Sequence, residues 1–116
     1  MLVPGGFSLY EIMQNAATEA GDGTVINVGG TPDGAFTVLD MQVNGISGTE
    51  EITFKGTWDG TNYEVIMCEN LGTGVFAATA SADGVYRFII GGCQSVMADI
   101  TTYDAGTITI TGIASA

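Results

Sequence analysis

Short apolar stretches rich in β-branched residues alternate with compact turn clusters between Gly56 and Gly112. The clusters contain Asp, Asn and Gly, which tight turns favour: Asp59-Gly60-Thr61-Asn62, Asn70-Leu71-Gly72-Thr73-Gly74, Ala82-Asp83-Gly84 and Tyr103-Asp104-Ala105-Gly106. Apolar stretches bounded by such turns are typical of short antiparallel strands. This rhythm therefore predicts a β fold and limits the space left for helices.

Eight strands are expected from the alternation of apolar and polar residues. They cover residues 24–28, 35–44, 50–57, 63–69, 75–80, 85–90, 95–102 and 107–113. The residues expected to face the core include Leu39, Met41, Val43, Ile52, Phe54, Tyr86, Phe88, Ile90, Val96, Ala98, Ile100, Ile108, Ile110 and Ile113. Asp59-Gly60 predicts a hairpin between the third and fourth strands. The segment 75–80 has few large anchors and is expected at a sheet edge, facing another subunit.

The predicted fold class is all-β, an antiparallel two-sheet sandwich with a jelly-roll-like topology. An eight-stranded barrel fits the strand count equally well. Residues 23–116 are assigned to the sandwich and residues 1–22 to an N-terminal arm or short helix. The helix is suggested by a capping box of Ser8 and Glu11 at the start of residues 7–20. The alternative is an extended arm that lies over a neighbouring molecule.

The charge balance excludes several classes of partner. Thirteen acidic residues face only Lys55 and Arg87, so the formal net charge is −11. Such a surface repels nucleic acid and anionic lipid. No apolar run approaches the ~20 residues that a membrane span requires, and no secretory signal is expected at the start of the chain. We therefore expect neither nucleic acid nor a membrane as partner.

The residue types that usually carry catalysis are scarce. Histidine is absent, and five aspartates next to or near glycines are expected to bind their own turn backbones: Asp22, Asp33, Asp59, Asp83 and Asp104. The strand-end glutamates at positions 50, 51, 64 and 69 are possible Ca²⁺ ligands. No Asp-x-Asp-x-Asp spacing supports such a site. We expect no catalytic residues, cofactor or metal.

Cys68 and Cys93 are the only cysteines. Each falls in or beside a predicted strand, where a free thiol behaves as a small buried apolar group. A disulfide between them is the alternative. Two cysteines without histidine are too few for a zinc site.

Trp58 borders the predicted Asp59-Gly60 hairpin and has two interpretations. Its ring either packs at the sheet edge and covers the end of the core, or forms a platform for a sugar together with Tyr63. The packed ring is favoured, because a single aromatic platform without polar neighbours is weak support for ligand binding.

Three segments carry a resemblance to a known group: Phe54-Lys55-Gly56-Thr57-Trp58-Asp59-Gly60-Thr61-Asn62-Tyr63, Ala82-Asp83-Gly84-Val85-Tyr86-Arg87-Phe88-Ile89-Ile90-Gly91-Gly92 and Tyr103-Asp104-Ala105-Gly106-Thr107-Ile108-Thr109-Ile110-Thr111-Gly112. In this order they resemble a recurrent structural module of tailed bacteriophages. That module has a "G-x-x-DGTNW" turn, a "G-x-Y-R" strand opening and a closing "Y-x-x-G-x-x-T-V-T" strand. The similarity covers about half of the chain.

The resemblance implies a virion component. A small stand-alone copy of the module is similar to decoration or cement proteins, which stabilise phage heads, often as trimers. It implies a major capsid protein as partner, a homotrimer, and a place on the capsid surface after synthesis in the host cytoplasm. Contacts are expected outside the matched motifs: in Phe7, Leu9 and Tyr10, and in Met97 and Asp99, where the module usually carries arginines.

The alternative function is a glycan- or receptor-binding module of a phage fibre or tail tip. Trp58 and Tyr63 would then form the ligand platform.

Overall fold

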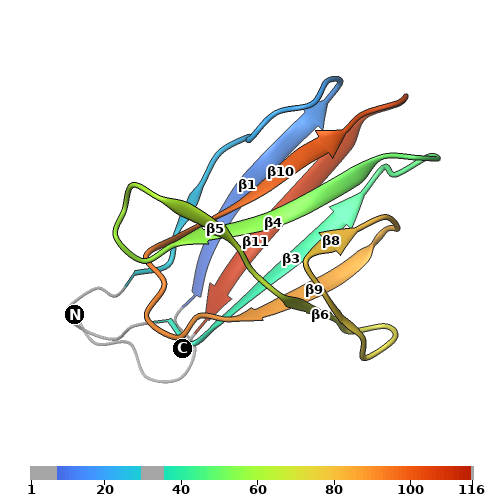
Figure 1. Cartoon of the computed structure of the whole chain (residues 1–116). Helices are drawn as coiled ribbons and strands as arrows, with labels where there is room; N and C mark the ends of the chain where they lie inside the picture. The colour runs from blue at the N-terminus through green and yellow to red at the C-terminus, as the bar shows by residue number, and fades with distance from the viewer. Residues whose placement is uncertain (1–7, 30–35, 116) are drawn as a thin grey trace.

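The computed structural model describes residues 8–29 and 36–115. These residues form eleven strands in two antiparallel sheets, the two layers visible in Figure 1. The strands are β1 (Ser8–Ala17), β2 (Ile26–Asn27), β3 (Val38–Asn44), β4 (Glu51–Thr57), β5 (Tyr63–Val65), β6 (Cys68–Asn70), β7 (Phe76–Ala77), β8 (Thr79–Ala80), β9 (Gly84–Ile89), β10 (Ser95–Thr102) and β11 (Ile108–Ser115). Across these residues the chain forms no helix able to span a lipid bilayer.

The two sheets confirm the predicted sandwich. One has six strands in the order β1-β11-β3-β9-β6-β7, and the other has the order β2-β10-β4-β5, with β8 also paired to β4. Two separate sheets rule out the eight-stranded barrel. The strand order does not confirm the jelly-roll topology, since alternation reports which side of a strand is buried but not which strands are neighbours.

Alternation predicted the buried sides of most long strands correctly. The inward residues of β3, β4, β9 and β10 form one core between the sheets. β11 is the exception, because Ile113 points outward and is 43% exposed. Gly112 takes the inward position, where an added Cβ would come within 2.8 Å of the Met13 sulfur. Met13 from β1 thus fills the space that was predicted for Ile113.

The predicted helix over residues 7–20 is wrong in its described part. Ser8–Ala17 is strand β1, paired to β11 from Ser8 opposite Ser115 to Ala17 opposite Ile108. The pairing is shifted between Ile12 and Gln14 and again between Gln14 and Ala17. Such bulges break the two-residue alternation. The apolar residues therefore fall at spacings of three and four that imitate a helical face.

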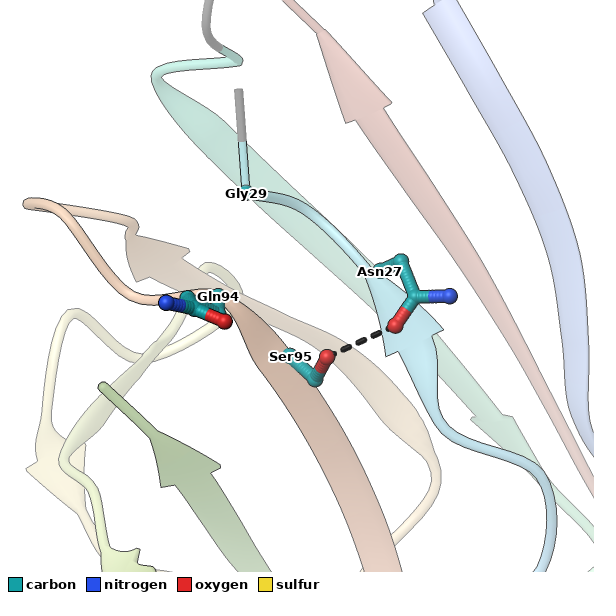
Figure 2. A pocket seen from close by; sticks show the side chains of 4 residues that line it. All are labelled: Asn27, Gly29, Gln94 and Ser95. Atoms are coloured by element: carbon teal, nitrogen blue, oxygen red, sulfur yellow. Dashed lines mark hydrogen bonds between the residues drawn. The ribbon is translucent and has the colours of Figure 1, made fainter. Parts of the chain in front are cut away.

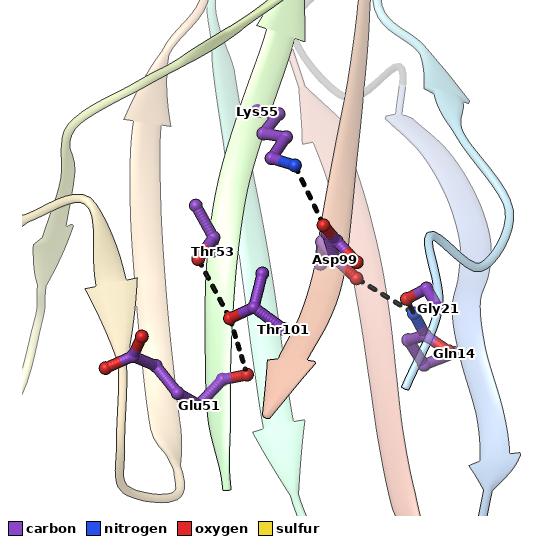
Figure 3. A network of polar contacts seen from close by, with 8 residues as sticks. Gln14, Gly21, Glu51, Thr53, Lys55, Asp99 and Thr101 are labelled. Carbon is purple, nitrogen blue, oxygen red and sulfur yellow. Dashed lines mark hydrogen bonds and ion pairs between the residues drawn. The ribbon is translucent and has the colours of Figure 1, made fainter. Parts of the chain in front are cut away.

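The bulge in β1 also links the two sheets. It turns Gln14 inward, where the side chain is 6% exposed. Its Nε2 atom donates to the carbonyl oxygens of Gly21 at 3.0 Å and of Ala98 in β10 at 2.9 Å (Figure 3). Residues near Gly21 then run beside β10, with which Gly21 forms a bridge at Ile100.

Two predicted strands are each divided between the sheets. The segment 63–69 becomes β5, which pairs with β4 across the expected Asp59-Gly60 hairpin, and β6, which pairs with β9. The crossing at residues 66–67 buries Ile66 and exposes Met67. The segment 75–80 similarly becomes β7, at the predicted sheet edge, and β8. These two divisions and the additional strand β1 raise the strand count from eight to eleven.

Candidate interaction surfaces

The outward side of the six-stranded sheet forms a continuous surface, here called the open face. One row of directly paired residues crosses all six strands: Tyr10, Ile113, Asp40, Arg87, Glu69 and Phe76. Paired residues on neighbouring strands point to the same side of a sheet. The six side chains therefore share one face, with aromatic residues at its two ends.

Large apolar side chains on the open face are exposed. Tyr10 is 61% exposed, Phe76 58% and Ile89 63%, and Ile12 and Ile113 are also exposed. Of these, Tyr10 was predicted as a contact residue, and Phe76 lies in the segment 75–80 that was expected to face another subunit. The uninterrupted apolar run Phe88-Ile89-Ile90 was an available signal, since one of three consecutive strand residues must point away from the core.

An ion pair lies at the centre of the open face. Arg87 donates to Asp40 through two atoms, Nε to Oδ1 at 2.7 Å and Nη2 to Oδ2 at 2.9 Å. This hydrogen bonding, with the negative charges of Asp40 and Glu69, raises the pKa of the Arg87 guanidinium. The arginine therefore stays charged, and it lies between the apolar residues Tyr10 and Ile113 at one end of the row and Phe76 at the other.

The outward side of the five-stranded sheet, here called the polar face, is organised differently. Lys55 donates to Asp99 at 2.8 Å, while Thr53 and Thr101 are 3.1 Å apart and hydrogen-bonded (Figure 3). Hydrogen bonding to Asp99 raises the pKa of Lys55, against the effect of burial. Polar pairs thus cover much of this side, where β10 lies between β4 and the segment around Gly21.

The sequence-predicted contact residues are dispersed over the fold. Phe7 lies outside the described residues. Leu9 is partly buried and packs against the core, whereas Tyr10 is on the open face. Met97 and Asp99 are each only 8% exposed on the polar face. The structure thus does not bring these residues together.

A shallow polar depression lies at one end of the sandwich, lined by Asn27, Gly29, Gln94 and Ser95 (Figure 2). The Ser95 hydroxyl is 2.7 Å from the Asn27 side-chain oxygen and donates to it. The Asp59-Gly60 hairpin borders this end, since a Cβ on Gly60 would lie 3.4 Å from the Gln94 side-chain oxygen. Amide and hydroxyl groups of this kind are able to bind polar ligands.

Trp58 combines features of both interpretations. Its ring packs edge-on against Phe88, with ring centres 6.4 Å apart, and its Nε1 donates to the Gly91 carbonyl at 3.2 Å. It nevertheless remains 46% exposed. Tyr63 is half-buried beside the same hairpin, opposite Thr57. The ring therefore supports the end of the core and still presents an aromatic surface.

Asp59 has the predicted turn role. Its carboxylate accepts hydrogen bonds from the backbone N–H groups of Asn62 and Thr61 and from the side chains of Asn62 and Thr57. These bonds, those from the Asn62 and Thr61 backbone first, lower the pKa of Asp59 well below its ordinary value. Asp83 departs from the prediction, because its carboxylate accepts from the N–H of Ile46 in another loop at 2.9 Å.

Glu50 joins two loops instead of offering a Ca²⁺ ligand at the surface. Its fully buried carboxylate accepts from the N–H groups of Ala105 at 2.9 Å, Ser47 at 2.6 Å and Gly48 at 3.1 Å. These bonds lower the pKa of Glu50 to about 2, although burial acts against them. Gly45 permits the close approach of the loops: it has φ of 104°, and a Cβ there would overlap the Thr107 carbonyl oxygen.

Cys68 and Cys93 are free and buried, as predicted. Burial raises the pKa of Cys68 to about 12 and also raises that of Cys93. Both thiols are therefore poor nucleophiles at neutral pH. In residues 8–29 and 36–115, no group of three or more His, Cys, Asp or Glu side chains is arranged to hold a metal ion.

Two solved structures share this fold. The SPBc2 prophage-derived protein YomS superposes with a TM-score of 0.81 at 21% identity, over 93% of this chain and 92% of YomS. The PBSX exported protein XepA superposes with a TM-score of 0.84 at 19% identity, over 93% of this chain but only 37% of XepA. The chain thus spans little more than a third of XepA. A comparison with curated proteins finds no match.

Of the two similar structures, YomS is described as a prophage-derived protein and XepA as an exported protein. The sequence model of one family, XepA, matches residues 9–114, from strand β1 to strand β11. The match includes both sheets and covers nearly the whole chain. The protein belongs to the XepA family.

Proposed function

We propose that this chain is a non-catalytic structural protein of a phage particle, a decoration or cement protein that binds the outer surface of the head and stabilises it. Its partners are the major capsid protein and further copies of itself, in a homotrimer as the module's resemblance implies. It is made in the host cytoplasm and ends on the virion. Membranes and nucleic acid are not its partners, in keeping with its net charge of −11.

The observation that carries the proposal is a strongly acidic surface on a sandwich whose buried polar side chains are hydrogen-bonded. Every buried side-chain nitrogen and oxygen in the described residues has a hydrogen-bond partner. Exposed glutamates such as Glu19, Glu51 and Glu64 supply negative charge around this rigid core. Complementary charge accelerates docking to a basic surface. A stable domain whose charge is almost all negative is suited to binding a basic shell in many copies.

The chemistry of the described side chains supports a role without catalysis. Glu50 and Asp59 are held ionised by backbone N–H groups, whereas a general acid needs a pKa near the working pH. The two thiols are shifted in the direction that suppresses nucleophilic attack. The name of the relative XepA describes an exported protein, which is compatible with a place in particles released from the cell.

Incubation of the purified chain with heads of its own phage that lack it tests the proposal. We expect the chain to sediment with the heads in a copy number near that of the major capsid protein, and to raise the temperature at which they break. Higher salt should slow the association. Sedimentation with tails alone, or binding to neither part, would contradict the proposal.

A matched variant tests the electrostatic part. Glu19→Gln, Glu51→Gln and Glu64→Gln together remove three exposed charges. We expect slower association with heads and little change in dissociation, since exposed charges act mainly on the encounter rate. Unchanged association rates in both the variant and high salt would show that charge does not guide docking.

A glycan- or receptor-binding module of a fibre or tail tip is the second candidate function. It is favoured by the half-exposed Trp58 ring at the end of the sandwich that holds the polar depression. Glycan-array binding that disappears in both Trp58→Ala and Gln94→Ala would support it. Tyr10→Ala removes a more exposed aromatic ring from the open face and should leave such binding intact.

A further inference from the structure

We propose that the end of the sandwich beside the Asp59-Gly60 hairpin binds an uncharged oligosaccharide through two adjoining subsites. Trp58 forms one subsite, and the polar depression of Asn27, Gln94 and Ser95 forms the other. The inference rests on the second candidate function and gives it a ligand class and a minimum ligand length. It does not depend on whether the chain binds a phage head.

The strand register places the two subsites next to each other. Ser95 in β10 is paired directly with Asn27 in β2 on one side and with Thr57 in β4 on the other. Trp58 follows Thr57, whose carbonyl oxygen accepts from the Gln94 N–H at 2.8 Å. Because neighbouring strands are about 4.8 Å apart, Asn27 and Thr57 are separated by roughly 10 Å across the sheet. That span exceeds one sugar ring and suits a chain of at least two.

The depression offers hydrogen-bonding groups on a fixed backbone. Its volume is about 350 Å³, within the roughly 300–1,000 Å³ of small-molecule sites. The Gln94 carbonyl oxygen accepts from the N–H groups of Val28 at 2.8 Å and Gly29 at 2.7 Å, which holds Gln94 beside that segment. Its side-chain amide is exposed and carries both donors and an acceptor. Among the lining side chains, Figure 2 shows one hydrogen bond, from Ser95 to the Asn27 oxygen, so the Asn27 amide nitrogen keeps its donors for sugar hydroxyls.

The Trp58 ring supplies the apolar part of the site. Its packing against Phe88 and its Nε1 hydrogen bond to the Gly91 carbonyl oxygen hold the ring in one orientation, although the residue stays half-exposed. A Cβ on Gly92 would lie 3.9 Å from the ring, so the glycine leaves this side of the ring uncovered by a side chain. The C–H groups of a sugar ring are able to pack on such an aromatic surface.

Charge restricts the ligand to uncharged sugars. Lys55 and Arg87 are the only lysine and arginine in the chain, histidine is absent, and both cations are paired with carboxylates elsewhere. The carboxylate or phosphate group of an anionic sugar would therefore gain no charged hydrogen bond at this end. The Asp59 carboxylate of the hairpin stays ionised and would repel it.

Fluorescence titration of the full chain with oligosaccharides of one to three units tests the proposal. The probes are uncharged N-acetylchito-, cello-, manno- and malto-oligosaccharides, with sialyllactose as the anionic probe. Trp58 is the only tryptophan, so its emission reports the aromatic subsite directly. We expect at least one uncharged trisaccharide to change this emission and to bind at least tenfold more tightly than its monosaccharide. Sialyllactose should not bind.

Variants separate the two subsites. Gln94→Ala should weaken trisaccharide binding at least tenfold and leave monosaccharide binding at Trp58 nearly unchanged. Gln42→Ala is the matched control, because it removes an exposed side-chain amide from the six-stranded sheet, and it should bind like the wild type. Trp58→Ala should abolish binding, as measured by calorimetry. If this variant loses its native circular dichroism, Asn27→Ala replaces it, since the Asn27 side chain is exposed.

The possible outcomes distinguish this inference from the proposed functions. No emission change with any uncharged probe, or unchanged trisaccharide binding in Gln94→Ala, would overturn it. Equal affinity for monosaccharides and trisaccharides would overturn the two subsites. Binding of sialyllactose alone would overturn the ligand class while supporting the second candidate function. Binding to heads without binding to sugars would remove the inference and leave the decoration function standing.

Discussion

The two outward faces of this sandwich are built from similar strands but differ in how far their outward side chains are exposed. On the polar face, outward residues such as Met97 and Asp99 are nearly buried by their neighbours. On the open face, the outward residues Tyr10 and Ile89 are more than half exposed. The difference indicates that the polar face contributes more to the stability of the single chain, whereas the open face leaves large apolar side chains exposed.

The largest expected effect is on the free energy of unfolding when one apolar residue on each face is truncated to alanine. Met97→Ala should destabilise the chain by about 2 kcal/mol, because it removes a nearly buried side chain and leaves a cavity. Ile89→Ala should cost no more than about 0.5 kcal/mol, since Ile89 is largely in water already. Urea unfolding at concentrations too low for self-association measures both. Equal losses would remove the distinction between the faces.

The ion pairs of the two faces provide the next comparison. Lys55→Met leaves the Asp99 carboxylate, 12% exposed in its side chain, without its partner, and should cost about 1–2 kcal/mol. Arg87→Met leaves Asp40 with a side chain 29% exposed, which water is able to reach, so the loss should be smaller. Urea unfolding again measures the difference. Replacing Asp99 with Leu in the Lys55→Met background should recover part of the loss, since no unpaired charge remains.

Alkaline pH should separate the same two ion pairs without changing both at once. The pKa of Lys55 is raised in the folded chain, so its stabilising effect is complete below its unfolded pKa of about 10.5 and is lost as pH rises through the folded value. Arg87 keeps its charge throughout this range. Tyr86, Cys68 and Cys93 also have raised pKa values in the folded chain, so their ionisation at alkaline pH lowers the unfolding free energy as well.

The contribution of Lys55 is therefore obtained by difference. Unfolding free energies measured from pH 8 to 11.5 should fall less steeply in Lys55→Met than in the wild type. Arg87→Met should follow the wild-type slope. A steep decline that persists unchanged in Lys55→Met would mean that the buried tyrosine and cysteines, not the polar-face ion pair, limit the alkaline stability.

Much of the fold was predictable because it depends on local chemistry. The buried sides of β3, β9 and β10 follow from alternation, and the hairpin at Asp59-Gly60 follows from turn chemistry. The identity of β1 was missed because its bulges give the apolar residues a helix-like spacing. The order of the strands depends on pairings between distant segments, for which a single sequence carries no local signal.

The candidate surfaces were less predictable than the fold. Alternation places Met97 and Asp99 on an outward side, but it does not show that neighbouring segments cover them. It also treats Tyr10 as part of a separate arm, although pairing with Ile113 places it in a surface shared by six strands. Exposure on a sheet depends on what lies beyond the strand itself. That information is fixed only when both sheets are assembled.

The smallest expected effect is a difference in sign between two responses to salt. Binding to a basic capsid surface should weaken as salt rises, because screening reduces an attraction. Assembly of the proposed homotrimer should strengthen by less than about tenfold, because screening reduces the repulsion between chains of charge −11. Sedimentation velocity at low and high sodium chloride measures this response. Trimer assembly that weakens with salt would require attraction between charges on neighbouring copies.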